Sequence, residues 1–362
     1  MDILLISFTA FSFIIFLIML AIDLRKPFSR RTYGSELHPY GYHPKVLVIV
    51  PCRGKDLTLG RNLRSIKNQE YGGSFRVVAV VDEAEDKAVP IIRKAGIEFA
   101  VSGQLNGMSS GKVTAILAAI RKFNGYKMYV IADSDIEVDK HWLSNLVSPM
   151  QDRTIGISTM FPYFNPVGGF WSKVKMAWGF VGESLLESES SRFGWGGSLA
   201  FRKGIIDRWF INLATRTKYG VSDDICITIA AKRKGLRIAY TRKSQPKVNS
   251  NDSFGQFLEW ANRQTALTIL GYKKNLYIGV FYYSAEIILL VSGISLSIFA
   301  SPIFIVYFFH LLQSYLKAFR RARKPYPELI LIVPIMPFLY LANLLVASRM
   351  DHIVWRGRKY PL

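Results

Sequence analysis

The chain has 362 residues, of which 50% are hydrophobic, and its formal net charge is +21 at pH 7. This length holds one catalytic domain of ordinary size together with further elements. A positive charge of this size is compatible with nucleic-acid binding, but the basic residues gather beside long apolar stretches, at 24–31 and 317–324. That placement indicates an anionic lipid surface, so we expect the membrane bilayer, and no nucleic acid, among the partners.

Residues 3–22 form a run of 20 residues without a charged side chain, which is long enough to cross a bilayer as a helix. A cleaved signal peptide is the alternative. However, no basic residue precedes the run and no small-residue cleavage site precedes Asp23. We therefore expect a retained transmembrane anchor over residues 1–24, with the basic residues that follow it on the cytoplasmic side.

A doubly wound α/β domain is expected over residues 45–265. The predicted strands are 46–50, 75–83, 96–103 and 128–132, and the predicted helices are 59–68, 91–95 and 109–123. Alternation of buried strands with helices predicts a Rossmann-like parallel sheet that binds a nucleotide at the carboxyl ends of its strands. The turn after the first strand, PCRG, is not the glycine-rich turn of a dinucleotide-binding protein, and a P-loop is absent from the sequence.

Two carboxylates follow the apolar run 128–132, at Asp133 and Asp135. Hard oxygen ligands at this edge of the sheet suit a divalent cation that bridges to phosphates, although a solvated turn has the same composition. Lys112 lies in the first turn of the helix predicted at 109–123, where its charge opposes the helix dipole. An anionic phosphate at the helix start would explain it, and an ordinary surface lysine is the alternative.

A second apolar region covers residues 276–316, interrupted only by Glu286 and His310. Its length allows two spans with a break near Ser301 and Pro302. The two polar groups are either functional within the membrane or buried against neighbouring helices.

The third apolar segment, Leu329–Ala347, contains Pro334 and Pro337. Because proline breaks a helix, we expect a re-entrant or interfacial hairpin that does not cross completely, and hence a cytoplasmic carboxyl terminus. Residues 266–362 are then a membrane region with two or three hydrophobic segments and a basic tail. The protein is expected to be an integral, multi-pass membrane protein with its catalytic domain in the cytoplasm.

Short motifs distributed along the chain resemble those of one enzyme family. In order they are PCRG, VVDE, SGK, ADSD, GGFW, WGGS, SDD and LEWANRQ, and the terminal WRGRKY resembles the tail of the same group. The chain resembles a membrane-bound family 2 type glycosyltransferase of GT-A fold, and most closely the ceramide glucosyltransferase-like group. An ordered set of this kind is far more specific than any one of its members.

The resemblance implies a role for each matching residue. It implies nucleotide-sugar binding by Pro51, Arg53, Asp82, Lys112, Asp133, Gln256, Trp260 and Arg263. It places Mg²⁺ or Mn²⁺ on Asp133 and Asp135, in the D-x-D form. The general base on the acceptor hydroxyl is expected to be Asp224, with Asp223 as its alternative.

One position departs from the family pattern. The family motif (Q/R)-x-x-R-W is matched by residues 256–260, but Glu259 stands where arginine is expected. A glutamate cannot contact a diphosphate as an arginine does. Arg263 shares a helix face with Glu259 and is the expected substitute for this cation.

Aromatic residues lie between the metal motif and the expected base, in FPYF (161–164) and in WGGS (195–198). They suit stacking against a sugar ring, and simple packing is the alternative for each of them. For Gly196 and Gly197 we expect a role in a tight turn.

The expected function is transfer of a hexose from a nucleotide sugar of the UDP-glucose kind to a lipid hydroxyl at the cytoplasmic membrane surface. A processive polysaccharide synthase and a polyprenyl-phosphate sugar transferase are the alternatives among enzymes. A membrane scaffold with a degenerate transferase domain is the alternative outside enzymes, and Glu259 is its best support.

Overall fold

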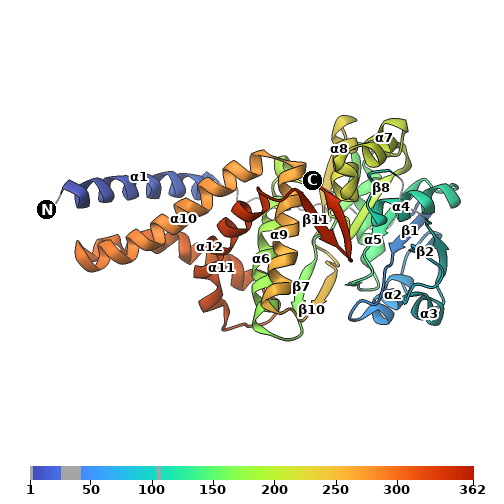
Figure 1. Cartoon of the computed structure of the whole chain (residues 1–362), viewed down its shortest axis with the longest axis horizontal. Helices are drawn as coiled ribbons and strands as arrows, with labels where there is room; N and C mark the ends of the chain where they lie inside the picture. Colours follow the sequence, from blue (N-terminus) through green and yellow to red (C-terminus); the bar gives the residue numbers. More distant parts are fainter. Residues whose placement is uncertain (1–2, 26–41, 104–106) are drawn as a thin grey trace. The chain divides into compact units, whose positions relative to one another are not determined.

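The computed structural model describes residues 3–25, 42–103 and 107–362, which form two compact units (Figure 1). The apolar unit consists of Met1–Arg30, Gly169–Val181 and Asp252–Met350. The sheet unit consists of Arg31–Gly168, Gly182–Asn251 and Asp351–Leu362. The expected boundaries at 24, 45 and 265 differ from this division, because each unit is assembled from three separate stretches of the chain.

The sheet unit is built on a seven-stranded sheet with the order β3-β2-β1-β4-β8-β6-β9. The strands are β1 (Val46–Pro51), β2 (Phe75–Val81), β3 (Glu98–Val101), β4 (Met128–Ala132), β6 (Ile155–Thr159), β8 (Ser198–Arg202) and β9 (Arg237–Tyr240). β1 to β4 run parallel, β8 is antiparallel to β4 and β6, and β9 is parallel to β6. The carboxyl ends of β1, β2 and β4 therefore meet at one edge.

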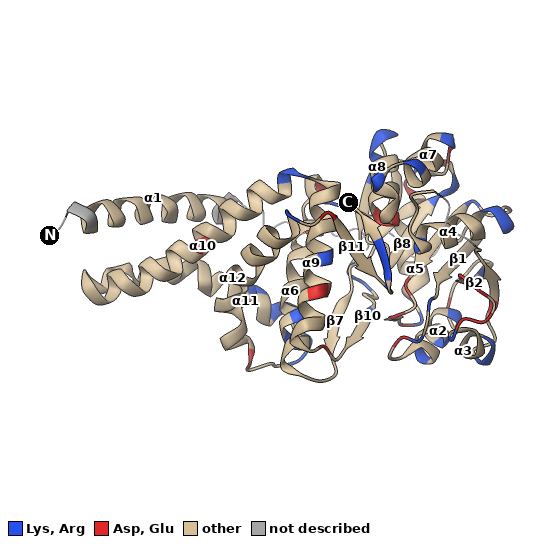
Figure 2. Ribbon diagram, in the orientation of Figure 1, with Lys and Arg blue, Asp and Glu red and all other residues tan. Residues whose placement is uncertain are grey.

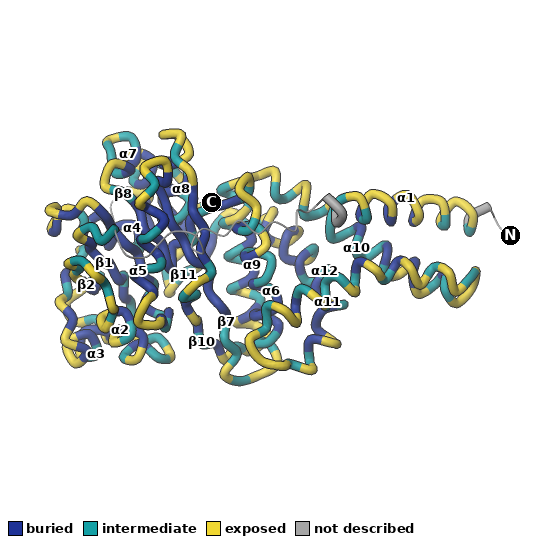
Figure 3. Tube along the Cα trace, turned by 180° about the vertical axis from the view of Figure 1, so that it is seen from behind, coloured by how far each residue is buried: buried dark blue, intermediate teal, exposed yellow. Residues whose placement is uncertain are grey.

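Helices cover this sheet and enclose its core. They are α2 (Leu59–Lys67), α3 (Val89–Lys94), α4 (Gly111–Lys122), α5 (Trp142–Val147), α7 (Arg208–Arg216) and α8 (Asp223–Arg233). The residues Val46, Leu47, Val48, Ile49 and Val50 are fully buried, as expected for a strand covered on both faces, and Figure 3 shows the central strands in dark blue. Every strand and helix predicted between residues 46 and 132 is present, which confirms the doubly wound α/β fold.

Two smaller sheets complete this unit. One has the order β5-β10-β7 and contains β5 (Ile136–Glu137), β10 (Lys247–Ser250) and β7 (Tyr163–Pro166). The other is the hairpin of β11 (His352–Trp355) and β12 (Arg358–Pro361) at the carboxyl terminus. The tail is thus part of the same compact unit as the large sheet.

The apolar unit is helical. It contains α1 (Ile3–Arg25), the first part of α6 (Phe170–Glu187), α9 (Phe254–Gly271), α10 (Lys274–Phe299), a 3₁₀ helix (Pro302–Phe308), α11 (Phe309–Arg321) and α12 (Leu329–Ala347). α1 packs along α10, and the Phe16 and Tyr307 rings stack with centroids 5.2 Å apart. Figure 2 shows almost no charged residues on these two helices.

Four segments of the described chain are long and apolar enough to cross a membrane: Leu5–Ile22, Lys274–Phe299, Pro302–Arg321 and Leu329–Ala347. The predicted break near Ser301 and Pro302 is confirmed, because α10 ends at Phe299 and a 3₁₀ helix begins at Pro302. The two polar groups of this region face each other. His310 Nε2 contacts the Glu286 carboxylate, and both side chains are buried, which agrees with the packing alternative.

The predicted hairpin within Leu329–Ala347 is wrong, because α12 is one continuous helix of 19 residues with Pro334 and Pro337 inside it. Proline at position 334 leaves the carbonyl of Ile330 without its usual helical N–H partner. The hydroxyl of Tyr315, on α11, donates to that carbonyl over 2.6 Å. A neighbouring side chain thus replaces the lost hydrogen bond, which is how prolines are tolerated in apolar helices.

Candidate active site

The candidate site lies at the edge where β1, β2 and β4 end. Arg53 follows Pro51, the last residue of β1; Asp82 directly follows β2; and Asp133 directly follows β4. Ala132 pairs with Ser198 of β8, and the backbone N–H of Asp133 donates to the carbonyl of Gly197 over 3.1 Å. The sheet register therefore brings the WGGS loop to the D-x-D loop.

Lys112 lies at the centre of this site. α4 begins at Gly111, two residues after the predicted start, because the side chain of Ser110 caps it by accepting from the backbone N–H of Val113. The Nζ of Lys112 is 2.7 Å from Asp133 Oδ1 and 3.3 Å from Asp223 Oδ1, and it donates to the carbonyl of Gly196 over 3.1 Å. Only 8% of its side chain is exposed, which excludes an ordinary surface lysine.

The charges of this cluster depend on one another. Burial alone would lower the pKa of Lys112, but Asp133 and Asp223 outweigh burial and raise it. Burial raises the pKa of both carboxyl groups, and the Lys112 ammonium opposes that rise. The lysine therefore favours the charged forms of the two acids and limits, without cancelling, the rise in pKa that burial causes at each of them.

Gly196 is required by the close approach of this cluster. A Cβ at this position would lie 2.4 Å from Asp223 Oδ2 and 2.9 Å from Lys112 Nζ. The expectation of a tight-turn role was therefore incomplete, since the absent side chain makes room for charged groups. A second glycine, Gly197, makes room for the indole of Trp195, which a Cβ would meet at 2.1 Å.

The two acids of SDD differ in their surroundings at the start of α8. Asp223 is buried, and its Oδ2 makes no hydrogen bond to any residue that the structure describes. Asp224 is half-buried, and its Oδ1 accepts from the hydroxyl of Ser222 and, over 2.8 Å, from the N–H of Ile225. Asp223 thus belongs to the lysine cluster, whereas Asp224 is held by groups of its own helix start.

Asp82 binds two arginines through one oxygen. Its Oδ2 lies 3.1 Å from Nη1 of Arg53 and 3.0 Å from Nη1 of Arg358, a residue of the terminal hairpin. Arg358 and its neighbour Arg356 were missed as site residues. The available signal was the likeness of WRGRKY to the family tail, which marked this segment but gave no contacts.

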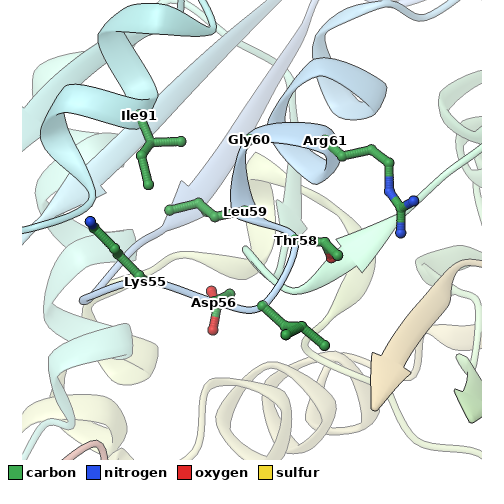
Figure 4. A pocket seen from close by; sticks show the side chains of 8 residues that line it. Lys55, Asp56, Thr58, Leu59, Gly60, Arg61 and Ile91 are labelled. Atoms are coloured by element: carbon green, nitrogen blue, oxygen red, sulfur yellow. The ribbon is translucent and has the colours of Figure 1, made fainter. Parts of the chain in front are cut away.

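An open pocket of about 430 Å³ adjoins this edge. It is formed by the loop between β1 and α2 and by the start of α2, and its lining residues are Lys55, Asp56, Leu57, Thr58, Leu59, Gly60, Arg61 and Ile91 (Figure 4). The carboxylate of Asp56 also accepts a hydrogen bond from the hydroxyl of Ser134, the middle residue of the D-x-D loop. The pocket wall and the expected metal loop are therefore directly connected.

The carboxylates of Asp133 and Asp135 suit a hard cation, provided that other ligands complete its coordination shell. Among residues 3–25, 42–103 and 107–362, no group of three or more His, Cys, Asp and Glu side chains is arranged to hold a metal ion. Mg²⁺ often binds through one or two carboxylates and completes its shell with substrate phosphates and water. The residues therefore fit a cation that is held jointly with a phosphorylated ligand.

Three predicted binding residues belong to the apolar unit: Gln256, Trp260 and Arg263, all on α9. The side chain of Gln256 completes a capping box with Ser253, a function that the spacing S-x-x-Q indicates but that the prediction overlooked. Trp260 packs edge-on against Trp178, with ring centroids 4.9 Å apart. The predicted donor-binding roles of these three residues remain predictions.

The aromatic residues of FPYF pack mainly on one another. Phe161, Tyr163 and Phe164 are buried, and the Phe161 ring contacts Phe164 and Trp195 at centroid distances of 6.0 and 5.9 Å. Trp195 is half-buried. For the buried rings the packing alternative therefore describes the structure better than stacking on a sugar.

Comparison with known proteins gives a family match over nearly the whole chain. The profile of the family described as Glycosyl transferase family 21 matches residues 4–362. An N-acetylglucosaminyltransferase of Rhizobium sp. (strain N33) is 35% identical over 133 residues, 36% of this chain and 28% of that protein. An N-acetylglucosaminyltransferase of Bradyrhizobium elkanii is 34% identical over 116 residues, 31% of this chain and 63% of that protein. The chain thus aligns with less than two thirds of either relative.

Among solved structures, a mannosyltransferase of Pyrobaculum calidifontis in complex with GDP-Man and Mn²⁺ is similar in fold. Its TM-score is 0.56 at 17% identity, and the alignment covers 95% of this chain and 96% of that one. At this identity the similarity concerns the fold alone, and it confirms the GT-A fold that the sequence motifs implied.

The lysine cluster leads to a stability prediction. Lys112→Met should leave the half-buried Asp133 and the buried Asp223 without their common cation. Removing one partner of a fully buried ion pair typically costs about 3–5 kcal/mol, and we expect less here because 29% of the Asp133 side chain is exposed. Lys122→Met, at the exposed end of the same helix, is the control. Thermal unfolding of the detergent-solubilised full chain should show a large decrease in unfolding temperature for the first variant only. Adding Asp223→Asn to that variant should partly restore the unfolding temperature. Equal unfolding temperatures for both lysine variants would contradict this assignment.

Proposed function

Because this chain belongs to glycosyl transferase family 21, we propose that it transfers a hexose from a nucleotide sugar to the hydroxyl of a membrane lipid, with inversion at the sugar. Family membership makes the chain a glycosyltransferase, as expected from its motifs. The observation that carries the proposal is the convergence of Asp82, Lys112, Asp133 and Asp223 at the carboxyl edge of one sheet. That edge is where open α/β sheets bind their ligands.

In this proposal, residues at different strand ends bind different parts of the nucleotide-sugar donor. Asp82 and Arg53 bind the nucleoside end, next to Pro51, and Asp133 and Asp135 hold a divalent cation at the diphosphate. Bound there, Mg²⁺ or Mn²⁺ would stabilise the negative charge that develops on the departing diphosphate. Lys112, 2.7 Å from Asp133, favours the charged form of that carboxylate, which is the form that binds a cation.

We assign the general base to Asp224. A base must accept the proton of the acceptor hydroxyl as that oxygen attacks the sugar. The hydrogen bonds from Ser222 and from the N–H of Ile225 orient the carboxylate through Oδ1. Asp223 is less suited to this role, because its Oδ1 is paired with Lys112.

The donor proposal centres on UDP-glucose. The relatives' names add N-acetylglucosamine, and the similar structure contains GDP-Man, so nucleotide sugars of glucose, N-acetylglucosamine and mannose form the first panel to test. A lipid acceptor is supported by the four segments that are long and apolar enough to cross a membrane. An intact charge cluster argues against a degenerate scaffold, since even paired charges at a buried site add little stability and are costly to keep without use.

The tail constrains the membrane topology that we propose. Three candidate spans lie between the sheet unit's last internal stretch and Asp351–Leu362, which belongs to the same unit. Three complete crossings would separate the tail from Asp82, its ion-pair partner. Two crossings return the chain to the catalytic side, and the basic stretch 317–324 favours the cytoplasm for the end of α11. We therefore propose that α12 does not cross completely.

The metal assignment predicts the behaviour of Asp135→Asn. The amide is nearly isosteric but uncharged, so metal-dependent donor binding should weaken by at least about tenfold while the fold is kept. Asp139→Asn, an exposed acid of the same region, is the control. Binding is measured by titrating the full chain with UDP-glucose at fixed Mn²⁺. Unchanged metal dependence and turnover would remove Asp135 from the site.

The base assignment predicts a different pattern for Asp224→Asn. Transfer should fall by roughly 10²- to 10⁴-fold with donor binding preserved, because the base acts on the acceptor in the transition state. Glycolipid formation and donor affinity are measured side by side. If Asp223→Asn abolishes transfer at preserved affinity and Asp224→Asn is mild, the neighbouring acid is the base.

The topology is tested by single cysteines at positions 362, 324 and 94, where Lys324 and Lys94 are exposed. Native Cys52 and Cys226 are buried. We expect an impermeant thiol reagent to label all three positions only after permeabilisation of the cells. Labelling of 362 in intact cells would contradict a cytoplasmic tail. Labelling of position 324 alone in intact cells would mean that α12 crosses the membrane and that Pro302–Arg321 does not.

A further inference from the structure

The carboxyl-terminal hairpin, labelled β11 in Figure 1, contacts the candidate site through three of its residues, all within the sheet unit. Arg356 donates from Nη1 to the carbonyl of Arg53 over 2.7 Å, and its Nη2 contacts the carboxylate of Asp56. Arg358 pairs with Asp82, as described above. The hydroxyl of Tyr360, a buried residue, accepts from the N–H of Gly111, the first residue of α4.

The turn of this hairpin contains Arg356, a residue type that is unusual at a position with positive φ. Trp355 pairs with Arg358, so the loop consists of Arg356 and Gly357, with φ of 50° and 74°. Two-residue turns with positive φ at both positions favour Asn-Gly or Gly-Gly, because a longer side chain is strained in the left-handed region. An arginine kept at such a position indicates that its side chain is needed there, and strain of this kind gathers at functional sites.

Arg356 also lies in the electric field of the D-x-D loop. Burial alone would lower its pKa, but Asp56, and after it Asp135 and Asp133, raise it. Asp56 in turn accepts from the hydroxyl of Ser134, so the chain of contacts runs from the hairpin tip to the metal loop. The guanidinium has five N–H donors, and two contacts leave several for an anion.

The proposed diphosphate position requires a positively charged side chain. A diphosphate brought to an edge occupied by Asp56, Asp82, Asp133 and Asp135 is repelled unless positive groups compensate, and Lys112 is already held by two carboxylates. α9 has Glu259, exposed, where the family motif has arginine. An arginine is the side chain best suited to bind a diphosphate through several N–H groups at once.

We propose that the hairpin is part of the donor site and that Arg356 is the side chain that contacts the donor diphosphate. This inference rests on the proposed function. Arg358 and Tyr360 are positioning residues, which hold the hairpin on Asp82 and on the start of α4. In this proposal the tail supplies, within the sheet unit, the arginine that the family motif has at the position of Glu259.

The test uses Arg356→Asn, because asparagine tolerates positive φ and therefore keeps the turn while removing the cation. Lys359→Asn, an exposed residue of the same hairpin, is the matched control for charge. The full chain is titrated with UDP, GDP, ADP and CDP in the presence of Mn²⁺, and with the monophosphate of each nucleotide that binds. Thermal unfolding is measured on the same samples.

We expect Arg356→Asn to weaken diphosphate binding by roughly 10- to 100-fold, as for loss of a charged hydrogen bond, with a smaller effect on the monophosphate and an unchanged unfolding temperature. The control should bind as the wild type does. Wild-type affinity in Arg356→Asn overturns the inference and leaves the proposed function standing. A wild-type chain that binds no nucleoside diphosphate overturns both.

A second measurement needs no variant. The Arg356 side chain is 32% exposed, so phenylglyoxal can reach it in the unmodified protein. We expect the bound nucleoside diphosphate with Mn²⁺ to protect Arg356 from modification, as read by mass spectrometry of the terminal peptide, while exposed Arg349 is modified equally with and without it. Equal modification of Arg356 in both conditions would overturn the inference even if the variant fails to fold.

Discussion

One ammonium group between a half-buried and a buried carboxylate determines how this site is built. Lys112 from the start of α4 must reach Asp133 at the end of β4 and Asp223 at the start of α8, and each distance is short. Its positive charge opposes the rise in pKa that burial causes at both acids. The same requirement explains why residue 196 has no side chain, because a Cβ there would occupy the space of the ion pairs.

The fold could be predicted from the sequence because its signals are local. The apolar, β-branched run Val46–Pro51 is typical of a buried strand. The side chain of Ser110 caps α4 and thereby determines where that helix starts. The strand ends then place Asp82 and Asp133 at one edge by topology alone. The partners of Lys112 could not be predicted, since they depend on loops that lie 21 and 111 positions further along the chain at Asp133 and Asp223. Proline at 334 misled the prediction because the compensating hydroxyl, Tyr315, belongs to another helix.

The carboxyl-terminal hairpin bears on both the proposed topology and the proposed donor site. Its hairpin belongs to the sheet unit, although more than ninety residues of apolar helices, Asp252–Met350, precede it. In the proposed topology, the pairing of Arg358 with Asp82 keeps the chain end on the same side of the membrane as the catalytic domain. In the proposed donor site, the same hairpin holds Arg356 against Asp56. The proposed topology and the proposed donor contact therefore depend on the same hairpin. The proposed role of Arg356 would also give the departure at Glu259 a physical explanation, because another part of the chain would supply the arginine.

The central claim is that Asp133 and Asp135 hold a divalent cation only jointly with the donor diphosphate, and Mn²⁺ binding followed by electron paramagnetic resonance tests it most directly. The full chain is titrated with Mn²⁺ alone and then with UDP or GDP present. The account predicts weak binding of Mn²⁺ alone and a marked gain in affinity with the nucleotide, because two carboxylates leave most of the cation's shell to phosphate and water. Tight Mn²⁺ binding that is independent of the nucleotide, or no binding in either condition, would contradict it.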